Sequence, residues 1–169
     1  VNHLAHYLLA DRLLDALRRN APSRLVWVSS CTHYYINQSM WDDFQSPRWP
    51  PGDQQTRLDA YARTKVYGIM AADHLARKLR DTGVTVNSLQ PGHRETKLNG
   101  LWTGFPVEST VSPSFVAANE QIEGWTGLYW DYGNSIKQRS PVAESTANRR
   151  RLIDYTERTL RQLGYAIRG

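Results

Sequence analysis

The stretch "RLVWVSS" (Arg24–Ser30) decides the fold class of this chain of 169 residues. Its apolar run, residues 25–28, has no polar alternation and is typical of a strand buried on both faces, as in a parallel sheet. The stretch "VTVNSL" (residues 84–89) has the same character and is followed by a Pro-Gly turn. The sequence therefore predicts two strands of one parallel sheet.

A helical pattern precedes each predicted strand. Residues 1–19 are expected to form the first helix and residues 59–81 the second, with Gly83 placed to cap its end. The expected apolar stripes consist of Val1, Leu4, Leu8, Leu14 and Leu17 in the first helix, and of Ile69, Ala72, Leu75, Ala76 and Leu79 in the second. Helix, strand, helix, strand in this order predicts an α/β fold: half of a doubly wound parallel sheet with right-handed crossovers.

The rest of the chain is less regular. Residues 31–59 are polar, aromatic and proline-rich, and we expect them to form a long loop, which in compact domains is usually functional. The stretch "TGLYWDY" (residues 126–132) is a candidate third strand. A terminal helix is expected over residues 144–164, with Ser145 or Thr146 as its N-cap.

Composition excludes several classes of protein. The apolar content of 40% and charged content of 22% are typical of a globular chain rather than a disordered one. The net charge of +5 lies largely in arginines at predicted helix ends, where cations complement the helix dipole, so nucleic-acid binding is not expected. The single cysteine, Cys31, excludes an internal disulfide, and the five histidines show no metal-binding spacing, so no metal is expected.

The first residues also carry information. Val1 is not an initiator methionine, and a helical pattern begins at once, without the basic segment of a signal peptide. Asp11, Arg12 and Asp15 interrupt any membrane-spanning run. We therefore expect the chain to be part of a longer protein, with the question of a preceding membrane anchor left open.

The motif "YARTK" places Tyr61 and Lys65 four residues apart, on one face of the second predicted helix. A neighbouring cation favours the phenolate form of a phenol, which general acid-base work near neutral pH requires. The spacing alone also fits two ordinary surface residues. Ser30, after the first strand, and Pro91-Gly92, after the second, are predicted to lie at the same edge of the sheet, where ligands of parallel sheets bind.

Taken together and in this order, the segments "VNHLAHYLL", "RLVWVSS", "YARTK" and "TGVTVNSLQPG" resemble the short-chain dehydrogenase/reductase family. The likeness is to the branch of retinol dehydrogenases and WW-domain-containing oxidoreductases. It covers residues 1–98 and resumes at residues 123–164. By this resemblance the chain is the C-terminal catalytic portion, residues 1–169, of a single Rossmann-like domain.

The resemblance implies a role for each motif residue. Tyr61 would be the general acid/base, Lys65 would assist it and bind the nicotinamide ribose, and Ser30 would hold the substrate oxygen. Asn2 would anchor a proton-relaying water. Pro91, Gly92 and Thr96 would contact the nicotinamide end of NAD or NADP, with NADP favoured.

Each role has a plain structural alternative. Asn2 fits a helix cap, Ser30 a strand end, Pro91-Gly92 a simple turn and Thr96 a loop hydroxyl. For Cys31 and His33 the structural interpretation is preferred.

The chain also departs from the family pattern. The Gly-rich strand-turn-helix that would cradle the cofactor pyrophosphate is absent, and "HRET" (residues 93–96) follows the Pro-Gly turn where relatives have apolar residues. A retinol dehydrogenase-like oxidoreductase acting on a hydrophobic alcohol, aldehyde or ketone is one hypothesis, with this fragment inactive alone. A non-catalytic remnant or binding module is the other.

Two further expectations follow from the resemblance. It implies a homodimer formed through helices near residues 1–19 and 59–81. It also implies a cytoplasmic or membrane-associated location, the latter through a segment that would precede this chain.

Overall fold

The computed structural model describes residues 1–42, 54–92 and 113–168 of the chain. Within these ranges the fold is α/β, built around a sheet of four strands in the order β1-β2-β3-β4. The strands are β1 (Ser23–Val28), β2 (Val84–Leu89), β3 (Tyr129–Asp131) and β4 (Ser135–Ile136). The α-helices are α1 (Leu4–Arg19), α2 (Gln38–Asp42), α3 (Gln54–Lys78), α4 (Pro113–Ala118), α5 (Pro141–Glu144) and α6 (Thr146–Gln162). Short 3-10 turns are η1 (Cys31–Tyr35), η3 (Glu120–Ile122) and η4 (Tyr132–Asn134).

The sheet is mostly parallel, as the sequence predicts. β1 pairs in parallel with β2, β2 pairs in parallel with β3, and only β4 runs antiparallel to its neighbour. β2 has the predicted bounds, whereas β3 is shorter than the expected strand over residues 126–132. This arrangement is a partial Rossmann-like fold, which confirms the predicted fold class.

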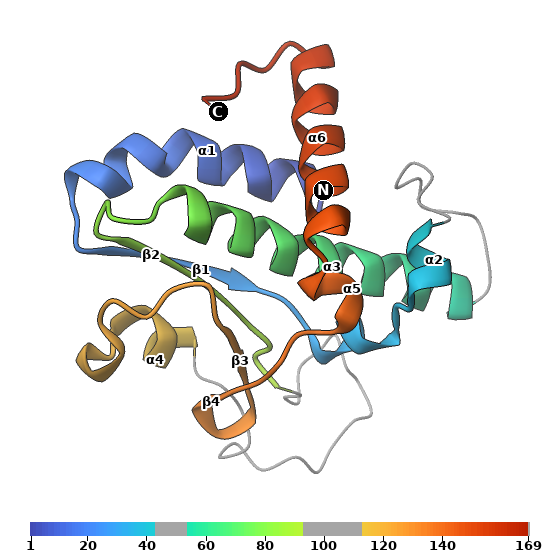
Figure 1. The fold of residues 1–169 in the computed structure, drawn as a ribbon, viewed down its shortest axis with the longest axis horizontal. Coiled ribbons are helices and arrows are strands. Elements are labelled where there is room, and N and C mark those ends of the chain that lie inside the picture. The colour runs from blue at the N-terminus through green and yellow to red at the C-terminus, as the bar shows by residue number, and fades with distance from the viewer. Residues whose placement is uncertain (43–53, 93–112, 169) are drawn as a thin grey trace.

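Helices cover both faces of the sheet (Figure 1). α1 and α3 lie on one face, where Trp27 of β1 and Val86 of β2 enter a core between the sheet and the two helices. α4 lies on the other face, where Val116 packs in one cluster with Leu89 and Val26. Because strand residues alternate between faces, this double cover explains the continuous apolar runs of β1 and β2.

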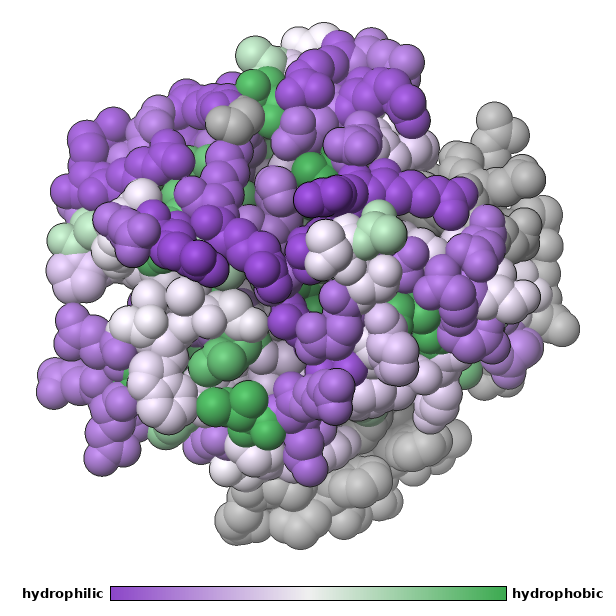
Figure 2. All heavy atoms as spheres, in the orientation of Figure 1, coloured by the Kyte–Doolittle hydropathy of each residue, from purple (hydrophilic) through white to green (hydrophobic). Residues whose placement is uncertain are grey.

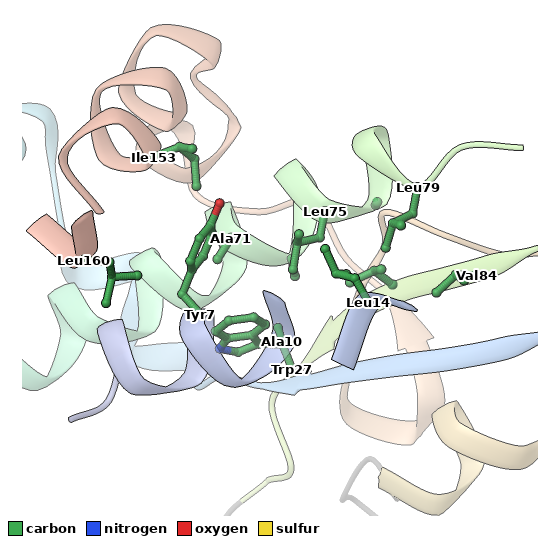
Figure 3. Packing of buried hydrophobic residues seen from close by; sticks show 13 residues of the cluster. Tyr7, Ala10, Leu14, Trp27, Ala71, Leu75, Leu79, Val84, Ile153 and Leu160 are labelled. Carbon is green, nitrogen blue, oxygen red and sulfur yellow. The ribbon is translucent and has the colours of Figure 1, made fainter. Parts of the chain in front are cut away.

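The core between helices and sheet joins distant parts of the chain. Figure 3 shows Tyr7 and Leu14 of α1 packed near Leu75 of α3, with Ile153 and Leu160 reaching the same cluster from α6. α6 thus closes the helical layer at one end (Figure 1). On the face shown in Figure 2, hydrophilic side chains dominate and apolar ones form small separate patches.

Several predicted boundaries need correction. α3 begins at Gln54 and ends at Lys78, not at residues 59 and 81, so Gly83 lies in the turn to β2 with φ of 75°. The expected loop over residues 31–59 contains η1, α2 and the first turns of α3. Ser145 is the N-cap of α6, and its hydroxyl accepts a hydrogen bond from Asn148 N–H.

The buried stripe of α1 also differs from the expected one. Tyr7, Ala10 and Leu14 are buried, whereas Val1 is fully exposed and Leu8 only half-buried. The predicted stripe counts only Val and Leu side chains. It therefore omits Tyr7, whose ring is buried in the core although its hydroxyl is polar.

Candidate active site at the carboxyl edge of the sheet

The carboxyl ends of β1 and β2 lie side by side. Val28 is opposite Leu89 in the register, and the Ser29 N–H donates to the Leu89 carbonyl at 2.6 Å. Ser30 and the Pro91-Gly92 turn follow directly after these strand ends. The structure therefore brings both segments to one edge of the sheet, where parallel sheets bind ligands.

Helix α3 carries Tyr61 and Lys65 to this edge. The Lys65 Nζ lies 5.2 Å from the centroid of the Tyr61 ring, and both side chains are half-buried. The Ser29 hydroxyl donates to the Lys65 carbonyl at 2.9 Å, which ties the helix to the end of β1. The Lys65 Nζ is also 3.4 Å from the Val28 carbonyl oxygen. Phenol and ammonium thus share one helix face beside the strand end.

Burial changes the chemistry of Lys65. Desolvation disfavours the charged ammonium and lowers the pKa of Lys65 from its ordinary value. The group still lies at cation–π distance from the Tyr61 ring, an arrangement that favours its charged form. The ammonium of Lys65 is therefore placed to stabilise a phenolate at Tyr61.

Ser30 is the N-cap of the 3-10 turn η1. Its hydroxyl oxygen accepts a hydrogen bond from the Thr32 N–H at 3.2 Å, so the hydroxyl proton is available to another acceptor. η1 packs against α3. Within the described ranges no hydrogen bond joins the Ser30 hydroxyl to Tyr61 or Lys65.

Asn2 is exposed and precedes α1, whose N-cap is His3 rather than Asn2. No hydrogen bond within the described part of the chain joins Asn2 to Lys65. The neighbouring His3 is the residue that reaches inward: its Nε2 lies 2.6 Å from the Thr156 hydroxyl. The structure therefore places Tyr61 and Lys65 beside the end of β1 that leads into Ser30, and it places Asn2 at the exposed start of α1.

The Pro91-Gly92 turn is held by two residues that the motif analysis missed. The Gly92 N–H donates to Gln90 Oε1 at 3.3 Å, and the Gln90 amide nitrogen donates to Asp131 Oδ1 at 2.5 Å. Gln90 and Asp131 are both buried. Each is a polar residue directly after, or at the end of, a buried strand, and this sequence signal could have identified them. Thr96 lies outside the described residues.

His33 is a second residue that the sequence analysis undervalued. Its side chain is fully buried in η1, and its Nδ1 lies 2.8 Å from the Ser30 carbonyl oxygen. The ring is 3.9 Å from the Tyr34 ring and 4.7 Å from the Tyr129 ring, centroid to centroid. Burial lowers the pKa of His33 to about 4, so the imidazole is neutral near pH 7. A histidine three residues after a strand-end serine pair was the available signal.

The Pro91-Gly92 turn is the segment of this edge that the family resemblance assigns to the cofactor. Gly92 adopts φ of 82°, a backbone region that favours glycine, and both residues of the turn are half-buried. None of the described segments forms a Gly-rich strand-turn-helix cradle for a pyrophosphate. In the same ranges, no group of three or more His, Cys, Asp or Glu could hold a metal ion. No helix among them is both long and apolar enough to cross a membrane.

Comparisons with known proteins show clear relatives. The chain is 32% identical to mouse retinol dehydrogenase 13 over 99% of its own length and 53% of that protein. It is 33% identical to human retinol dehydrogenase 14, with 93% of the chain and 50% of the relative aligned. Human WW domain-containing oxidoreductase is 30% identical over 96% of the chain and 43% of the relative. No family model matches. The chain spans about half the length of the curated relatives it matches.

Proposed function

This chain belongs to the short-chain dehydrogenase/reductase family, and on that premise we propose that the protein is an NAD- or NADP-dependent oxidoreductase of the retinol dehydrogenase type. NADP is the preferred cofactor in this proposal, and a hydrophobic alcohol, aldehyde or ketone is the substrate. The observation that carries it is the Tyr61–Lys65 pair at the carboxyl edge of the sheet, next to Ser30.

In this proposal the Tyr61 phenolate takes the proton of a substrate alcohol, or the Tyr61 phenol gives its proton to a carbonyl oxygen. A nicotinamide held at this edge would supply the hydride exchange. Lys65 stabilises the phenolate that forms, because its ammonium lies against the Tyr61 ring. Ser30 donates its free hydroxyl proton to the substrate oxygen. The Pro91-Gly92 turn would contact the nicotinamide, together with Thr96, and Asn2 would anchor a relay water.

The open side of the sheet supports the view that this chain is one part of the enzyme. β1 has a paired neighbour on one side only among the described strands. Its unpaired side borders a groove of about 220 Å³ lined by apolar residues such as Leu9, Leu13 and Val28, each more than 40% exposed. Strands of a parallel sheet are normally buried by other elements on both faces. We propose that further strands complete the sheet here, and that this chain alone lacks activity.

The homodimer stays part of the proposal. Leu58 on α3 is an exposed apolar side chain at one of the two helices expected to form it, and it lies outside the groove beside β1. The middle of α3 is already buried within the chain, so only its first turns are available for a partner.

A non-catalytic remnant or binding module is the alternative. Its supporting observation is that none of the described segments forms a Gly-rich strand-turn-helix cradle for a cofactor pyrophosphate. A measurement of oxidoreductase activity on a protein that also contains the missing half of the sheet distinguishes the remnant from the enzyme.

The test uses a chimera in which the amino-terminal half of mouse retinol dehydrogenase 13, up to the residue aligned with Val1, precedes this chain. We expect NADPH-dependent reduction of a hydrophobic aldehyde such as retinal, and a loss of about 10²- to 10⁴-fold in Tyr61→Phe. The chain alone should bind no NADPH at micromolar concentration in calorimetry, because the pyrophosphate cradle is missing. A folded chimera that binds NADPH yet reduces no aldehyde would favour the remnant.

A further inference from the structure

We propose that His33 is a positioning residue that fixes Ser30 for substrate binding, an inference that rests on the proposed function. Two donors of residue 33 converge on the carbonyl oxygen of Ser30: the ring Nδ1 at 2.8 Å and the backbone N–H at 3.2 Å. The Thr32 N–H holds the Ser30 hydroxyl oxygen at 3.2 Å. Three hydrogen bonds therefore define the position and orientation of Ser30.

The tautomer of His33 follows from the geometry. A carbonyl oxygen can only accept, so Nδ1 carries the proton, and in a neutral imidazole Nε2 is then a bare acceptor. Nε2 is buried and has no hydrogen-bond partner in the described part of the chain. An acceptor without a partner is compatible with a neutral ring, whereas an unpaired buried N–H or an imidazolium would cost more.

The ring of His33 is itself immobilised. Tyr34 packs against one side at 3.9 Å and Tyr129 of β3 meets it in a T-shaped contact at 4.7 Å. The Tyr34 hydroxyl donates to the Gln138 carbonyl at 2.7 Å, which fixes Tyr34 in turn. His33 thereby couples the strand-end serine to β3 and to the segment that follows β4.

This arrangement assigns His33 a role that burial alone does not require. Any apolar side chain of similar size could fill its site among the aromatic rings. Only a side chain with a donor at the Nδ1 position adds a second hydrogen bond to the Ser30 carbonyl, beside the one from the backbone N–H of residue 33. The position of the Ser30 hydroxyl should therefore depend on this side-chain donor as well as on the two backbone donors.

Two matched substitutions separate position from packing. His33→Asn places an amide donor close to where Nδ1 lies, whereas His33→Gln places its amide closer to Nε2 and leaves the Ser30 carbonyl without the ring donor. Both variants bury one neutral amide, and thermal unfolding verifies that both fold. Nitrogen NMR of the unmodified chain near pH 7 should show His33 neutral and protonated at Nδ1.

The readout independent of activity is amide hydrogen exchange at Thr32 and residue 33 in the chain alone. We expect exchange at both amides to be at least about tenfold faster in His33→Gln, and to change less than about threefold in His33→Asn. Equal acceleration in the two variants, or a wild-type ring protonated at Nε2, would overturn the positioning role.

The chimera adds the catalytic readout. His33→Gln should lower kcat as far as Ser30→Ala does, with the KM for NADPH unchanged, and His33→Asn should restore most of kcat. If the unmodified chimera folds but has no activity while the exchange difference is present, the oxidoreductase proposal fails and the positioning of Ser30 stands. If the chimera is active and both variants lose kcat equally, the positioning role fails alone.

Discussion

The two halves of helix α3 are built from different kinds of contact. From Val66 to Asp73 every residue is buried, whereas over residues 55–65 only Ala62 is. The second half anchors the helix between the sheet, α1 and α6. The first half presents Tyr61 and Lys65 at the edge of the sheet. The comparison shows that one helix can separate stability from chemistry along its length. Substitutions in the second half should therefore lower stability, whereas substitutions in the first half should lower activity with little change in stability.

The largest effect on stability is expected at Asp73, in the buried half. Its carboxylate lies 2.9 Å from Arg139 Nη1, 2.6 Å from Arg149 Nη1 and 3.0 Å from Arg77 Nε. Burial opposes ionisation of Asp73, but hydrogen bonds from Arg139 and the charges around it outweigh this and lower the pKa. Asp73→Ala leaves the buried Arg149 without its carboxylate partner, while Arg139 keeps Glu144. The substitution should lower the free energy of unfolding by about 3–5 kcal/mol in urea titrations.

The control for Asp73 is its exposed partner. The Arg77 side chain is 55% exposed, so Arg77→Ala removes a contact to the same carboxylate from the solvent side. Its effect should be no more than about 1 kcal/mol. Equal effects of the two substitutions would show that burial does not set the strength of this network.

Lowering the pH should reduce the free energy of unfolding by a comparable amount. Burial lowers the pKa of His3 to about 3 and that of His33 to about 4. The unfolded chain takes up protons near the ordinary pKa of about 6.5 while the folded chain does not, so stability is highest above that value and falls below it. His74, whose pKa burial also lowers, adds in the same direction.

Between about pH 7 and pH 5 the buried His3 and His33 should together remove about 4 kcal/mol from the free energy of unfolding. Denaturant titrations at several pH values measure this slope. The double variant His3→Asn, His33→Asn should have a flatter profile over the same range. An unchanged slope would mean that neither histidine is protected from protonation in the folded chain.

Gly68 tests the packing of the buried half directly. A Cβ at this position would lie 2.7 Å from Trp27 Nε1, and the Trp27 side chain is buried and cannot move aside freely. Alanine is the better helix former, yet overpacking should dominate and Gly68→Ala should cost about 1–3 kcal/mol. Calorimetric melting provides the measurement, with Ser39→Ala, an exposed site in α2, as the control. A stabilised Gly68→Ala variant would show that the packing around Trp27 is loose.

The sequence predicts the apolar half of this molecule better than its polar edge. The bounds of β2 follow from its own apolar run. The parallel pairing of β1 with β2 follows from the order of helices and strands along the chain. The Gln90–Asp131 contact joins residues 41 positions apart, and the His33 ring reaches β3, so both depend on a register that no local pattern encodes. The sequence predicts the start of α3 at residue 59 rather than Gln54 because the first turns of the helix lack the apolar period.

The smallest effect on stability is expected in the first half of α3, at the motif from which the function was inferred. Tyr61 and Lys65 are half-buried, their contact is a single cation–π pair at 5.2 Å, and the Lys65 bond to the Val28 carbonyl is long at 3.4 Å. Tyr61→Phe and Lys65→Met should each change the free energy of unfolding by no more than about 0.5 kcal/mol. A double-mutant cycle with Tyr61→Leu and Lys65→Met should give a coupling of about 0.5–1 kcal/mol, the usual size of an exposed cation–π contact. A coupling of several kcal/mol would instead make the pair a structural contact and remove the distinction between the two halves of α3.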